Sequence, residues 1–138
     1  MTGFIQSKIK NTRSLSMQNK AAGTATTAGY LYDLTAGLLV AATASSTRAT
    51  VKGVGNQAVT VAEALTQSLV IDISPDDTWL VDSTNNSDET HNGQVMIMGA
   101  NAYTVNNTGT TSAVGVVVQV GTFGAAADKK ILVQFIGV

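Results

Sequence analysis

The residues best suited to chemistry gather in one polar segment, VDSTNNSDETHNG, which runs from Val81 to Gly93. It holds the only histidine of the chain, His91, close to the carboxylates of Asp82 and Asp88. Such residues can form a nucleophilic triad only where a third group orients the histidine and water is excluded. His91 is instead followed by an Asn-Gly pair, which is typical of an exposed hairpin corner. We therefore predict that the protein is not an enzyme and has no catalytic residues.

The same segment offers oxygen ligands for a hard cation such as calcium. The candidate ligands are Asp82, Asn85, Asp88 and Glu89, but their spacing does not match an EF-hand loop. The triplets Asn-Asn-Ser at 85–87 and Asn-Asn-Thr at 106–108 also match the glycosylation pattern. Asn, Asp, Ser, Thr and Gly are equally the residues of turns, because they bond to their own backbone and accept left-handed angles. We favour turns, and predict no metal and no other cofactor.

The composition favours a structural β domain. The 138 residues are enough for one domain. Charged residues make up 12% of the chain, which is about half of the usual ~25%. The absence of cysteine removes disulfides and thiolate chemistry. A surface with few charges and many Thr and Ser side chains suggests a β sheet or contact with neighbouring subunits. No apolar run is long enough to span a bilayer and no signal-peptide pattern is present, so no membrane partner is predicted.

Charge divides the chain unevenly. Four of the eight basic residues lie in the first twenty positions, and no acid precedes Asp33. We predict an extended basic N-terminal arm over residues 1–27 and a single β domain over residues 28–138; a frayed terminus is the alternative. Basic residues without interleaved aromatic side chains give little support for nucleic-acid binding, so none is predicted. The arm residues proposed to contact a partner are Phe4, Ile5, Lys8, Ile9, Lys10, Arg13 and Lys20.

From Tyr30 onward the pattern is that of an all-β protein, either a small antiparallel β-barrel or a β-sandwich, with at most one short helix. Strands are expected on both sides of the turn at residues 35–37, and Gly53 and Gly55 predict a bulge or tight corner. Thr60 and Glu63 have the spacing of a helix capping box, which favours a short helical turn or loop, while the alternation of QAVTVAEAL leaves a strand as the alternative. A strand through residues 69–73, a turn at Pro75 and a strand from residue 79 follow.

Two segments near the C-terminus, AVGVVVQV and KKILVQFIGV, are apolar on both faces. A strand of this kind must be covered on two sides. We therefore expect a subunit interface around a symmetry axis, and hence a homo-oligomer. The alternative is a small closed barrel that buries both strands within one chain.

The stretch LYDLTAGLLVAATASSTRATVKGVGNQAVTVAEAL resembles the β-barrel register of the small capsid decoration (cement) proteins of tailed bacteriophages. The later segments WLVDSTNNSDETHNGQ and VNNTGTTSAVGVVVQVGTFGAAADKKILVQF are similar to small phage structural proteins of the same kind. The resemblance covers about Gly29 to Val138, and the N-terminal arm is not matched. Its motifs are compositional and loop-like.

This resemblance implies a structural virion protein on the outer surface of an icosahedral head. Its partner would be the major capsid protein, whose subunit contacts it would stabilise, and a homotrimer at three-fold positions would be the usual form. In the predicted arm, the apolar anchors would be Phe4, Ile5 and Ile9, while Lys8, Lys10 and Arg13 would bind capsid carboxylates. Two alternatives remain open: a phage tail or head-fibre component, and a carbohydrate-binding β module that stacks sugars on Trp79 or on Tyr30 and Tyr32.

Overall fold

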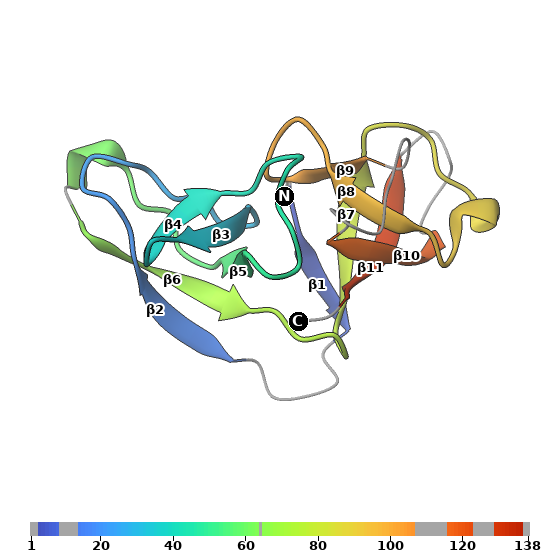
Figure 1. Cartoon of the computed structure of the whole chain (residues 1–138), viewed down its shortest axis with the longest axis horizontal. Coiled ribbons are helices and arrows are strands. Elements are labelled where there is room, and N and C mark those ends of the chain that lie inside the picture. Colours follow the sequence, from blue (N-terminus) through green and yellow to red (C-terminus); the bar gives the residue numbers. More distant parts are fainter. Residues whose placement is uncertain (1–2, 9–13, 64, 107–115, 123–128, 137–138) are drawn as a thin grey trace.

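The computed structural model describes residues 3–8, 14–63, 65–106, 116–122 and 129–136, and Figure 1 shows their arrangement. Over these residues the chain is built from strands and two single-turn 3-10 helices, which confirms the all-β prediction. The elements are β1 (Ile5–Lys8), β2 (Leu15–Asn19), β3 (Leu31–Thr35), β4 (Leu38–Ala41), β5 (Val51–Gly55), η1 (Val61–Glu63), β6 (Gln67–Asp72), β7 (Thr78–Ser83), η2 (Glu89–His91), β8 (Val95–Met98), β9 (Thr104–Asn106), β10 (Val117–Thr122) and β11 (Lys130–Phe135).

Five strands close into a barrel, on the right of Figure 1. One edge of β7 pairs with β11, and the other edge is shared by β1, at Thr78–Leu80, and β9, at Asp82 and Ser83. The ring continues from β9 through β8 and β10 back to β11. The β7–β9 pairing is parallel and the other pairings of the ring are antiparallel. Because β9 reaches only the end of β7, the start of that strand is an open edge that β1 covers.

The remaining strands form a five-stranded antiparallel sheet in the order β2-β6-β5-β3-β4, on the left of Figure 1. The sheet curls, so that its two edge strands, β2 and β4, approach each other. Directly paired residues share a face of a sheet. One face therefore carries the in-register row Leu31, Val54, Ile71 and Leu15, while Tyr32, Leu34 and Leu39 lie on the other.

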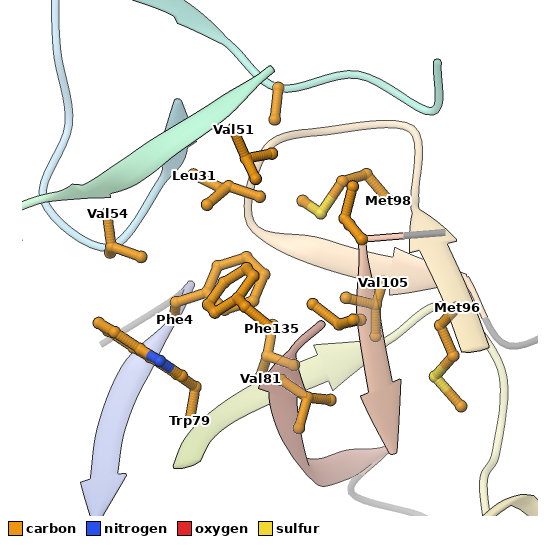
Figure 2. Close-up of a cluster of buried hydrophobic side chains, with 14 of the residues drawn as sticks. Phe4, Leu31, Val51, Val54, Trp79, Val81, Met96, Met98, Val105 and Phe135 are labelled. Carbon is orange, nitrogen blue, oxygen red and sulfur yellow. The ribbon is translucent and has the colours of Figure 1, made fainter. Parts of the chain in front are cut away.

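A continuous hydrophobic core joins the barrel to this sheet. Trp79, Val81 and Phe135 point into it from the barrel strands, and Leu31 and Val54 reach it from the sheet (Figure 2). All five side chains are nearly inaccessible to solvent. A smaller cluster of Tyr32, Leu39 and Val70 fills the opposite face of the sheet. Burial of each large apolar side chain contributes about 1.5–3 kcal/mol, so these two clusters supply most of the stabilisation.

Several local predictions are confirmed. The turn between β3 and β4 has positive φ angles at Ala36 (50°) and Gly37 (79°), as a tight hairpin turn requires. Pairing of β3 with β5 skips a residue between Gly53 and Val51, which is the expected bulge. Gly53 is also a close-approach site, because a Cβ there would lie 2.5 Å from the backbone oxygen of Ile71.

The predicted division into an arm over residues 1–27 and a body over residues 28–138 does not fit the N-terminal strands. β1 pairs with β7 of the barrel, and β2 pairs with β6 of the curled sheet. The physical reason is that both sheets have an open strand edge, and an extended N-terminal segment satisfies its hydrogen bonds. The basic charge and the lack of sustained periodicity in this segment hid two short strands.

One expectation in the second half of the chain is also corrected. The Asn92-Gly93 pair does not join two paired strands, because β8 pairs with β10 and β9 rather than with β7. Farther along, Asn and Thr residues are typical of loops, but residues 104–106 form β9. This short strand closes the barrel, and a three-residue strand gives too little alternation to be visible in the sequence.

The two-sided apolar strands of the C-terminus are β10 and β11, which lie side by side in the barrel. Val117, Ile131, Val133 and Phe135 are fully buried inside it. The alternative of a closed barrel is therefore sufficient to explain how the inner faces of both strands are buried within one chain. Their outer faces are partly exposed, with Val120 the most accessible at 39%.

Candidate functional site

His91 lies at the surface in the single-turn helix η2. Its Nδ1 atom is 3.2 Å from the backbone nitrogen of Asp88, as the partner in a capping box, and also 3.2 Å from the Asp88 Oδ1 atom. The two side chains are 26% and 63% exposed. The hydroxyl and backbone N–H of Thr90 both donate to Asp88 Oδ1, and these two bonds lower the pKa of that carboxyl. The contact of His91 with Asp88 is thus a helix cap in solvent.

A buried glutamine holds this cap against the barrel. Gln119 of β10 is fully buried, and its Nε2 atom donates to the backbone oxygen of Asp88 at 3.0 Å and to Oδ1 of Asn92 at 3.2 Å. The backbone N–H of Gly93 returns a hydrogen bond to Gln119 O at 2.7 Å. The polar segment that could have carried chemistry therefore forms ordered turns on one side of the barrel.

Two of the four candidate cation ligands have partners of their own. Asp82 forms an ion pair with Lys130 at 2.7 Å, on adjacent strands, while Asp88 caps η2. No group of three or more His, Asp or Glu side chains able to hold a metal ion occurs among the residues that the structure describes. Within the same residues, no helix is long and apolar enough to cross a membrane.

The proposed N-terminal contact residues have very different positions. Phe4 is only 2% exposed and packs against Trp79 and Phe135, so its role as a capsid anchor was wrong: the residue is a core side chain. Ile5 is half-buried and pairs with Leu80. Lys8 ends β1. The remaining candidates Ile9, Lys10 and Arg13 lie outside the described residues.

Lys20 is also buried. The residue is 2% exposed, and its Nζ atom donates to the backbone oxygens of Thr24 at 2.6 Å and Ala21 at 3.4 Å. The following loop thus folds back around the ammonium group. Lys20 stabilises that loop and is not available to bind a carboxylate of a partner.

The aromatic residues considered as a sugar platform are mostly buried. Trp79 is 0% exposed and Tyr32 is 3% exposed, so neither can stack on a ligand. Burial raises the pKa of Tyr32, whose hydroxyl oxygen accepts a hydrogen bond from the backbone N–H of Thr27. Tyr30 instead contacts Tyr103, with ring centroids 4.8 Å apart.

The feature that the sequence did not predict is an apolar surface on the five-stranded sheet. Large exposed apolar side chains in the described residues are Leu15, Met17, Leu38, Val40, Val61, Leu65 and Val120. Six of these seven belong to the sheet or the connection around η1, and only Val120 belongs to the barrel. We call Leu15, Met17, Leu38 and Val40 the edge patch, because they lie on the two edge strands.

All members of the edge patch project from the same face of the sheet. Leu15 is in register with Ile71 and Met17 with Leu69, whereas Val40 is in register with Asp33. Neither edge strand contains a charged residue. Charged side chains and proline are the usual protection of an exposed edge, and both are missing here.

The only carboxylate in register with the edge patch is held by the loop after β4. Ser46 donates to Asp33 Oδ2 at 2.5 Å and Thr50 donates to Oδ1 at 3.3 Å. Desolvation raises the pKa of Asp33, and these two hydrogen bonds oppose the shift. Beside β4, an apolar pocket of about 290 Å³ is lined by Ala21, Thr24, Ala25, Tyr32 and residues 38–41. The apolar surface of the edge patch therefore continues into a pocket beside β4.

Comparison with known proteins identifies no relative of this chain. No protein-family model matches the chain, and a search of the curated proteins gave no significant match. The fold, the edge patch and the sequence resemblance described above are therefore the basis for a proposed function.

Proposed function

We propose that this chain is a structural virion protein, namely a capsid decoration or cement protein. It binds the outer surface of an icosahedral phage head and stabilises the contacts between major capsid subunits. The observation that carries this proposal is the edge patch, where exposed Leu, Met and Val side chains lie on two strands without any charge. Left uncovered, such edges favour aggregation, so a protein partner is the simplest explanation for them.

The rest of the molecule supports the same role. A closed barrel provides a rigid platform, because closure leaves few unpaired backbone groups. The chain has few charged side chains, so a large contact area requires little desolvation of charge. Apolar side chains concentrated on one half of the molecule would give the protein a defined orientation on a shell.

The partner that we propose is the major capsid protein, and a homotrimer would match the three-fold positions of a head. A tail or head-fibre component would use the same apolar surface, so this alternative is separated by its location in the virion. Electron microscopy of virions with a tag on the chain distinguishes a label over the head from a label on the tail or on fibres.

Binding to phage heads tests the proposal directly. Heads of the phage that carries this protein, stripped of it, are sedimented with wild-type chain, with Val40→Lys and with Met17→Lys. Each lysine must be desolvated at the contact, and we expect at least about a ten-fold loss of affinity, which corresponds to ~1.4 kcal/mol. Val120→Lys is the matched control, because it charges a similarly exposed valine on the barrel. Unchanged binding of both edge variants, or an equal loss in Val120→Lys, would reject the edge patch as the capsid contact.

A further inference from the structure

β1 lies in a groove between distant segments of the chain. It pairs with the start of β7, and its residues share a pocket with the loop at Gly29 and with Val54 and Ile71 of the sheet. Phe4 packs in this groove against both Trp79 and Phe135, with ring centroids 6.5 and 5.4 Å away (Figure 2). The occupant is thus a short N-terminal peptide bound by strand addition and by one aromatic anchor.

Specific contacts fix the register of this peptide. The Phe4 N–H donates to Gly29 O at 2.7 Å, and Gly3 approaches Gly29 so closely that a Cβ would clash with its backbone. Farther along, Gln6 Nε2 donates to Asp77 Oδ2 at 3.0 Å. Residues 3–6 therefore match the groove in backbone, shape and polar contacts.

A short connection joins this peptide to the next strand of its own chain. β1 belongs to the barrel and β2 to the other sheet, and only residues 9–14 connect them. Withdrawal of β1 breaks a single strand pairing, because β1 pairs only with β7 among the described strands. That pairing is irregular between Gln6 and Lys8, and a pocket of about 290 Å³ lies beside Phe4 and Ile5.

We infer that the groove also binds residues 3–8 of a second copy, so that β1 is exchanged between chains. The contacts in an exchanged assembly are the same as those within one chain. The free-energy difference between the two forms therefore reduces to the strain of the connecting segment and the entropy of association, and short connections between elements favour exchange. Reciprocal exchange gives a closed dimer, and cyclic exchange gives a ring such as a trimer. This inference does not depend on capsid binding.

Complementary cysteine variants test the exchange, because the natural chain has no cysteine. Ile5 and Leu80 are directly paired, and both are partly exposed. Cross-strand partners are within the range that a disulfide can bridge. Ile5→Cys and Leu80→Cys are purified separately, mixed, unfolded and refolded together at high concentration, and then oxidised. We expect a covalent heterodimer at twice the mass of one chain on a non-reducing gel.

Two further samples make the result decisive. A mixture of Ile5→Cys with Ser45→Cys, which is exposed in a loop, reports collisions without pairing. The double variant Ile5→Cys/Leu80→Cys reports pairing within one chain. Heterodimer well above the Ser45→Cys mixture supports exchange. A heterodimer no more abundant than in that control overturns it, as does a solution mass of one chain for the wild-type protein at the highest concentration.

Discussion

Replacing Phe4 by alanine tests whether the N-terminus belongs to the folded body. The side chain is 2% exposed and contacts two aromatic rings, so the substitution removes a core residue. Phe→Ala in a core costs about 3–5 kcal/mol. The pocket beside Phe4 adjoins the new space and can admit water, which reduces the penalty of a dry cavity and places the expected loss near ~3 kcal/mol.

This loss is large enough to measure by two methods. With an unfolding entropy of about 2.1 cal/mol/K per residue, the 138 residues give ~290 cal/mol/K, so a loss of ~3 kcal/mol lowers Tm by about 10 °C. Urea unfolding followed by the fluorescence of Trp79, the only tryptophan, gives the free energy independently. Emission of the folded variant should also shift to the red, because Phe4 packs edge-on against the indole and its removal leaves space for water there.

A matched substitution on the same strand separates packing from a general effect on β1. Ile5 is partly exposed, so Ile5→Ala should cost less than about half as much as Phe4→Ala. If Phe4→Ala lowers stability by less than ~1 kcal/mol, the side chain is not held in the core and the placement of β1 is wrong.

Two further predictions concern the hairpin turn and the surface cap. Ala36→Asn should raise the free energy of unfolding by about 1 kcal/mol, because Ala36 has a left-handed φ of 50° that asparagine tolerates better than alanine. Gly37→Ala should lower the free energy of unfolding by a similar amount, because the φ of 79° is strained for alanine even though a Cβ there would meet no neighbour. Thermal unfolding of both variants checks these opposite signs. Asp88→Ala should lower Tm at pH 7 by removing the cap of η2. Because the folded pKa of Asp88 lies below 3.8, its contribution is complete above that value and is lost as the pH falls through the folded pKa. The difference in Tm between wild type and Asp88→Ala should therefore narrow in that range, and a difference that stays constant would contradict the role of the carboxylate.

The two proposals involve different surfaces of the molecule. Capsid binding uses the edge patch on β2 and β4, whereas strand exchange uses the groove on β7. A truncation of the first twenty residues cannot distinguish an arm from a body, because it removes both β1 and β2. Point substitutions on the two surfaces are therefore the appropriate experiments.

The local structure of this protein can be predicted from its sequence. Alternation identified the strands around Leu34, Ile71 and Val81, and the Ala36-Gly37 pair identified a turn, because these signals depend on neighbouring residues. Even the turn at Thr60 was predicted, and the Thr60 N–H donates to Glu63 Oε2 at 2.6 Å. The same local argument placed His91 at a turn, but it predicted a hairpin corner where the structure has the single-turn helix η2.

Which strand edges are paired and which stay open depends on contacts between distant segments. In the sequence, Phe4 looks like an exposed residue of a basic terminus. In the structure, the first half of β7 has an edge that, of the described strands, only β1 pairs with, and this pairing brings Phe4 into the core. Lys20 looks like a surface charge until its loop folds around it. Met17 and Val40 cannot be recognised as surface residues from alternation, since a buried strand and an uncovered one have the same pattern. The difference lies in whether a second layer covers that face, and contacts between distant segments determine it.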